Sequence, residues 1–212
     1  MRVRIWDWPT RLFHWLLVVL IPLQWWTAEQ DMMDLHILSG TVMLGLLLFR
    51  LLWGVFGSST ARFSNFVKGP RAVVSYLSGR AAQVLGHNPL GGWSVMAMLG
   101  LLSLQVGLGL IASDEDGLYS GPLSHLVDAE RSESAAEWHE QMFDLLVVLI
   151  ALHVAAILFY ALFKRRNLIG PMLVGTGEAP GDAAPMQPVP AWRFLIAAAL
   201  AGAGAWWIES GA

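Results

Sequence analysis

The sequence predicts an all-α integral membrane protein, a four-helix bundle with one additional C-terminal transmembrane helix. Of its 212 residues, 56% are apolar and only 14% are charged, a composition typical of chains that cross a membrane several times. A helix needs about 20 apolar residues to cross the hydrocarbon core of a bilayer, and five runs approach that length. The positive charges also gather on one side of the resulting topology.

The five predicted spans follow one another with short or medium connections. They cover residues 10–28, 35–56, 93–112, 138–163 and 192–208. The basic start "MRVR" before an apolar run also fits a secretory signal peptide. The bulky Trp25 and Trp26 argue against that alternative, because a cleavage site needs small residues there.

The chain is expected to divide into three parts. Residues 1–174 form the membrane domain of four transmembrane helices, and residues 175–191, rich in Pro, Ala and Gly, form a flexible cytoplasmic linker. Residues 192–212 form the fifth transmembrane helix and a short outer tail. Ala198 and Gly202 give this helix a small-residue pair suited to close packing, so we expect it to pack on the bundle, dock a partner subunit or mediate self-association.

The charged residues orient the chain with its N-terminus in the cytoplasm and its C-terminus outside. Among the connecting segments, only Arg131 then carries a positive charge outside, where acidic residues dominate. The inner segments hold Arg2, Arg4, Arg11, Arg62, Lys68, Arg71, Arg80, Lys164, Arg165, Arg166 and Arg193.

The absence of cysteine excludes disulfides, thiolate-ligated iron-sulfur clusters, covalently attached c-type haem and zinc-thiolate sites. Histidines are the remaining candidate ligands. His139 and His153 are fourteen residues apart, about 40° short of four full helical turns, so they share one face of the fourth span. They lie about 21 Å apart along the helix axis and mark two depths in the bilayer.

Each depth has a partner histidine on another predicted span. His14 lies near the inner end of the first span, at the depth of His153, and His36 lies at the outer end of the second span, at the depth of His139. Two neutral imidazoles facing each other between apolar helices are the ligand set of a b-type haem. Zinc is less favoured because it needs four convergent ligands. The alternative is that these histidines form hydrogen bonds between helices.

Four other polar residues in or near the spans have weaker assignments. Arg50 follows His36 by fourteen residues, so it lies at the inner depth and could pair with a haem propionate or extend to the headgroups. His87 and His125 lie in loops and are not expected to be ligands. Gln105 could contact a quinone, but a bond to a neighbouring helix is the preferred interpretation.

Several segments together resemble the bacterial cytochrome b561 family, which is similar to the b-type cytochrome subunit of membrane-bound nickel-iron hydrogenases. They are "WDWPTRLFHW", "GLLLFRLLWG", "ARFSNFVKGPRAVVSYL", "GHNPLGGW" and "LHVAAILFYALFKRRNLI". The resemblance covers roughly residues 3–174. It implies a bacterial inner-membrane protein in which four helices hold two b haems through His14, His36, His139 and His153. It implies nothing about the fifth span.

This resemblance leads us to expect electron transfer between the quinone pool, ubiquinone or menaquinone, and a periplasmic cytochrome c or redox subunit. Because an acidic outer surface attracts a basic cytochrome c and repels superoxide, an electron-transfer subunit is preferred to a stand-alone enzyme. The alternatives are a superoxide oxidase that reduces ubiquinone, and a non-redox membrane module that uses histidines. We expect membrane lipid as a further partner and no nucleic acid.

Overall fold

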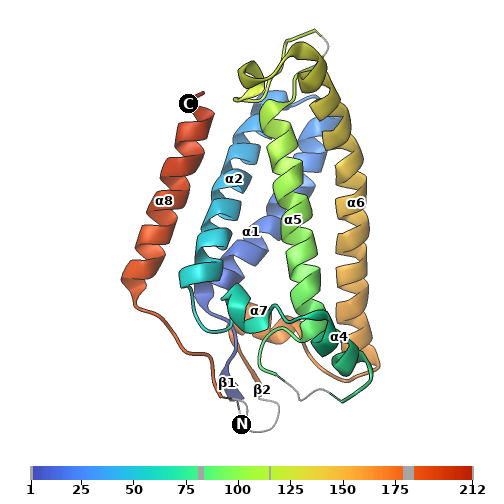
Figure 1. Cartoon of the computed structure of the whole chain (residues 1–212), viewed down its shortest axis with the longest axis vertical. Coiled ribbons are helices and arrows are strands. Elements are labelled where there is room, and N and C mark those ends of the chain that lie inside the picture. Colours follow the sequence, from blue (N-terminus) through green and yellow to red (C-terminus); the bar gives the residue numbers. More distant parts are fainter. Residues whose placement is uncertain (1, 81–83, 115, 179–183, 212) are drawn as a thin grey trace.

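The computed structural model is a bundle of long helices and describes residues 2–80, 84–114, 116–178 and 184–211. The long helices are α1 (Trp8–Glu29), α2 (Met33–Phe56), α5 (Pro89–Ile111), α6 (Ala129–Leu162) and α8 (Ala191–Glu209). Helix α2 lies at the centre and packs against α1, α5 and α8, while α6 packs against α5. The two chain termini lie at opposite ends of the bundle (Figure 1).

Four of these helices, α2, α5, α6 and α8, are long and apolar enough to cross a membrane, so the chain is a multi-pass membrane protein. The sequence predicts five spans, and the remaining one corresponds to α1. This helix has 22 residues but also contains Arg11, His14, Pro22 and Gln24, which make it less apolar. That α1 also crosses the bilayer stays a prediction.

Side-chain caps define where three long helices begin. Asp7, Asn88 and Asp128 each accept a hydrogen bond from a main-chain N–H in the first turn, at 2.9, 2.7 and 3.0 Å. The cap at Asp128 starts α6 nine residues before the predicted span at residue 138. The first turns of α6 are polar and lie in the acidic part of the sequence.

The two ends of the bundle differ in charge. The N-termini of α1, α5 and α8 and the C-termini of α2 and α6 meet at one end, which we call the basic end because the Lys and Arg residues of the connecting segments lie there (Figure 1). The opposite end, which carries Glu29, Asp34, Asp128 and Glu133, is the acidic end. Within the described residues, only one ion pair forms, the exposed Arg131–Asp128 contact at the acidic end.

Short elements close the basic end. They are β1 (Arg2–Arg4), α3 (Phe63–Phe66), α4 (Pro70–Leu77), α7 (Ile169–Val174) and β2 (Thr176–Glu178), while a 3-10 turn, η1 (Ser124–Leu126), lies at the acidic end. Strands β1 and β2 pair antiparallel, so part of the predicted linker pairs with the N-terminal segment. Residues 179–183 of that linker lie outside the described part of the chain. Residues 184–190 have no regular secondary structure.

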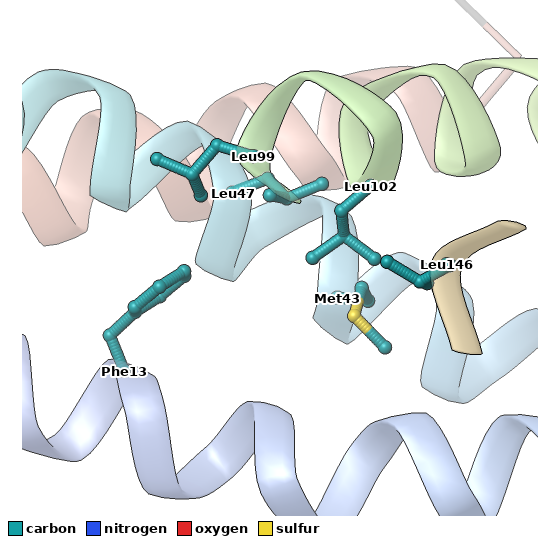
Figure 2. Close-up of a cluster of buried hydrophobic side chains, with 6 residues drawn as sticks. All are labelled: Phe13, Met43, Leu47, Leu99, Leu102 and Leu146. Atoms are coloured by element: carbon teal, nitrogen blue, oxygen red, sulfur yellow. The ribbon is translucent and has the colours of Figure 1, made fainter. Parts of the chain in front are cut away.

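The main hydrophobic core lies in the middle of the bundle. It joins Phe13 on α1, Met43 and Leu47 on α2, Leu99 and Leu102 on α5, and Leu146 on α6. Phe13 reaches toward Leu47 and Leu99, whereas Met43, Leu102 and Leu146 meet farther along the bundle (Figure 2). Leu146 is seven residues from both His139 and His153, so this core lies about 10 Å along the helix from each of them.

Helix α8 packs on α2 through a row of small residues. Ala197, Ala201 and Ala205 are buried, and the spacing of four places them on one face. A Cβ added to Gly45 of α2 would lie 3.5 Å from the Cβ of Ala205, so the two backbones are close. The predicted pair, Ala198 and Gly202, instead lines an apolar groove beside this row.

Candidate functional site

The four histidines of the long helices form two pairs, one near each end of the bundle. The ring centroids of His14 and His153, at the basic end, are 6.4 Å apart, and we call them the inner pair. Those of His36 and His139, at the acidic end, are 6.0 Å apart and form the outer pair. The inner pair joins α1 with α6, and the outer pair joins α2 with α6. Helix α6 therefore contributes a different histidine to each pair.

The spacing of both pairs fits two imidazoles bound to opposite sides of one iron. An imidazole nitrogen binds a metal at about 2.0 Å, so two such rings have centroids about 6.3 Å apart. The observed distances are 6.0 and 6.4 Å. Within the described residues, no group of three or more histidines and carboxylates that could hold a metal ion occurs. The donor set therefore fits haem better than zinc.

The ring of His36 is held by two residues of α1. Its Nδ1 donates to the main-chain carbonyl of Gln24 at 3.1 Å and lies 3.3 Å from Oγ1 of Thr27. A carbonyl oxygen can only accept, so we assign the hydrogen to Nδ1, which leaves the lone pair on Nε2 for a ligand. The Gln24 side chain returns a bond from Nε2 to the main-chain carbonyl of His36 at 3.1 Å.

The ring of His139 is held in the same way by α5. Its Nδ1 donates to the main-chain carbonyl of Gln105 at 2.8 Å, and Nε2 of Gln105 donates to the main-chain carbonyl of His139 at 2.8 Å. The preferred interpretation of Gln105, a bond to a neighbouring helix, is confirmed. Gly109 makes room for the ring, because an added Cβ would lie 2.9 Å from Cε1 of His139.

Each glutamine thus forms a reciprocal hydrogen-bond pair with one outer histidine. Gln24 and Gln105 lie on different helices, yet each accepts through its main chain and donates through its side chain. The sequence pattern alone did not indicate a role for Gln24. The available signal was a polar amide inside an apolar run, a costly feature that usually has a partner in the membrane.

The inner histidines lack such partners among the described residues. Nδ1 of His14 is buried without a hydrogen bond, and neither ring nitrogen of His153 has a hydrogen bond to the described part of the chain. The ring of His14 instead contacts Trp15 edge-on, at 5.1 Å between centroids. The two pairs therefore have similar spacing but different surroundings.

Arg50 lies at the basic end, where the sequence analysis expected it. It is only 2% exposed, and its guanidinium lies over the ring of Phe63 at 4.8 Å. The Phe63 ring in turn covers Gly54, where a Cβ would lie 2.0 Å from it. One guanidinium nitrogen of Arg50 is buried without a partner among the described residues, so the side chain can bind an anion.

His87 is partly buried at the basic end, with its Nδ1 buried, and His125 is exposed at the other end. The ring of His87 packs between Trp6 and Phe66, with centroids at 4.6 and 4.7 Å. Burial and, to a smaller extent, the charges of Arg50 and the inner histidines together lower the pKa of His87 to about 3. His87 is therefore a neutral ring beside the inner pair.

A polar contact at the basic end connects α4, α5 and α6. The hydroxyls of Tyr76 and Tyr160 are hydrogen-bonded, and Nδ2 of Asn88 donates to both, at 2.9 and 3.2 Å. Burial, and to a smaller extent the hydrogen bond to Tyr160, raises the pKa of Tyr76 to about 12. This contact fixes α4 against the ends of the two long helices.

Comparison with protein families finds a match that spans most of the chain. The family described as prokaryotic cytochrome b561 matches residues 5–175, a range that includes all four paired histidines and Arg50 and ends before α8. Comparisons with curated proteins and with solved structures found no match.

Proposed function

Because the chain belongs to the prokaryotic cytochrome b561 family of membrane b-type cytochromes for electron transfer, we propose that it carries electrons between the quinone pool and a periplasmic redox partner. The two histidine pairs, at opposite ends of the bundle with centroids 6.0 and 6.4 Å apart, are the observation that carries this proposal. The proposal assigns one haem b to each pair, which would make the chain a dihaem protein.

The histidines would hold the two groups at opposite depths of the membrane. Haem b, when bound, supplies a one-electron Fe(III)/Fe(II) couple. His36 and His139 would provide Nε2 at the acidic end, and His14 and His153 would provide the corresponding ligands at the basic end. Arg50 would supply a buried positive charge for a propionate at the inner site. The apolar core around Leu146 excludes water between the two sites.

The proposed topology places the chain in the bacterial inner membrane with five spans. Helix α1 is then the first span, the basic end faces the cytoplasm and the acidic end faces the periplasm. The positions of the termini at opposite ends of the bundle support an odd number of crossings (Figure 1). Helix α8 is the fifth span and covers one face of α2.

The acidic end is the proposed docking surface for the periplasmic partner. Glu29, Asp34, Asp128 and Glu133 give this end a negative surface, and Arg131 is paired with Asp128. Such a surface favours a basic partner, such as a c-type cytochrome, over the superoxide anion. Charge reversal at Glu29 and Asp34 should slow exchange with cytochrome c at low salt. Unchanged rates would favour superoxide or another small reactant.

The proposal is tested first on the purified full-length chain. We expect a b-type absorption spectrum, two haems per chain and reduction by a quinol. A colourless preparation from a haem-sufficient host would overturn the proposal and favour a non-redox membrane module. Substituting His36 together with His153 should remove both haems, because each pair then loses one ligand.

A further inference from the structure

We propose that Gln24 and Gln105 are positioning residues that give the outer site the lower midpoint potential of the two. This inference rests on the proposed function in one respect: both histidine pairs must hold haem b. It goes further by ranking the two sites and by assigning the difference to identified hydrogen bonds and one buried charge.

The two glutamines bond to the outer histidines with the same geometry. At both outer histidines, Nδ1–H is donated to the main-chain carbonyl of a glutamine on the neighbouring helix, at 3.1 and 2.8 Å. The glutamine amide donates back to the histidine main chain, at 3.1 and 2.8 Å. The return bond fixes the two helices in register, so the accepting carbonyl stays beside the ring.

These hydrogen bonds change the basicity of the ligands. A histidine whose Nδ1–H is held by a carbonyl has a fixed tautomer and a more basic Nε2. A more basic ligand stabilises Fe(III) relative to Fe(II), which lowers the midpoint potential. Both outer ligands receive this bond. Within the described residues, neither inner ligand does, and Nδ1 of His14 is buried without a partner.

Arg50 makes an independent contribution at the basic end. Its guanidinium is 2% exposed, lies over the ring of Phe63 at 4.8 Å near the end of α2 where the inner pair also lies, and has the carboxylate of Asp7 as an opposing charge. A buried positive charge stabilises the added electron of Fe(II) and raises the midpoint potential. The hydrogen bonds and the charge thus act in the same direction. At equilibrium, a single electron resides mainly at the inner site.

The ranking is tested by removing one site at a time. Redox titrations of the purified full-length chain, followed by absorption, should give two midpoint potentials. The His36→Ala variant, which lacks an outer ligand, should keep only the higher one, and His153→Ala should keep only the lower one. The opposite assignment in either variant would overturn the proposal.

The role of the glutamines is tested with near-isosteric substitutions. Gln24→Met and Gln105→Met remove the return bond and keep the side-chain length, so each should shift the lower potential upward and leave the higher one in place. Gln141→Met is the matched control, because Gln141 is exposed on α6 two residues from His139. The electron paramagnetic resonance signal of the outer site should change in the two test variants and not in the control.

The outcomes separate this inference from the proposed function. If the wild-type chain binds two haems but the Gln24→Met/Gln105→Met double variant leaves both potentials unchanged, the positioning role is wrong and the proposed function stands. A shift of the higher potential alone would also overturn the positioning role. A wild-type chain without haem would overturn the proposed function itself. If one single variant does not accumulate, the other tests the same hydrogen-bond arrangement on a different helix.

Discussion

Gly109 on α5 lies directly against the imidazole ring of His139 on α6. A Cβ at Gly109 would lie 2.9 Å from Cε1 and 3.2 Å from Nδ1 of that ring, closer than carbon and nitrogen atoms normally approach. The glycine therefore allows the ring to reach the Gln105 carbonyl. The outer site depends on the absence of a side chain at one position as well as on its ligands.

Gly109→Val should displace the His139 ring and selectively weaken the outer site. We expect about one haem per chain instead of two, because the inner ligands are not touched. The pyridine haemochrome assay measures this ratio. Gly107→Val is the matched control on the same helix, because a Cβ there would meet nothing within 4 Å. Equal haem loss in both variants would contradict the prediction.

His153→Ala should remove the inner haem and leave the outer one largely intact. The two pairs share only helix α6, and the core around Leu146 separates them. Haem content should fall to about half, and the remaining signal should belong to a site with two histidine ligands. His125→Ala provides the control, since His125 is exposed at the acidic end. Loss of both haems would mean that the sites are not independent.

Arg50→Gln should lower the potential of the inner site without removing its haem. The guanidinium is buried at the same end of the bundle as the inner histidines, and an amide of similar length cannot replace its charge. A redox titration should show the higher potential moving toward the lower one. Arg71→Gln, at an exposed position on α4, should leave both potentials unchanged. A shift of the lower potential alone would show that Arg50 acts on the outer site.

The protein should lose stability in mild acid because of His87. Folding lowers the pKa of this ring from 6.5 to about 3, so the unfolded chain takes up the proton first as the pH falls. The contribution of His87 is complete above pH 6.5 and is lost progressively below it, by about 1 kcal/mol at pH 5.5. His87→Leu should reduce the loss between pH 7.5 and 5.5 in thermal unfolding. His125→Leu should leave the pH dependence as in the wild type.

Helix α8 should be dispensable for haem binding but sensitive to side-chain size at Ala201. Ala201 is 3% exposed against α2, so Ala201→Leu overpacks the contact and costs about 1–3 kcal/mol. We expect faster protease cleavage in residues 184–190 and an unchanged haem content. Ala203→Leu is the control on the exposed face of the same helix. Loss of haem in Ala201→Leu would connect α8 to the sites.

Hydropathy and helical spacing predicted the long helices and the depth of the histidines from the sequence. The pairing of His14 with His153 followed because both lie near the same end of antiparallel helices, and the ring centroids are close. Whether these rings bind haem stays a prediction. The family resemblance was confirmed over residues 5–175.

Other features were not predictable from local sequence. The partner of Gln24 depends on how α1 and α2 pack, and a lone amide does not specify which carbonyl it will reach. The pairing of β1 with β2 joins segments more than 170 residues apart, which a pattern of three residues cannot indicate. The early start of α6 was missed because its first turns are polar, so hydropathy detects only the later part.

The position of α6 has a consequence for the order in which the protein is made. Both pairs take one histidine from this helix, yet their partners, His14 and His36, leave the ribosome more than a hundred residues earlier. At about 5–20 residues per second, His14 waits roughly 7–28 s for His153. Neither ligand pair is complete until His139 has been made, and the inner pair is complete only with His153. Two histidine ligands are therefore available to bind a cofactor only after most of the chain has been made and inserted into the membrane.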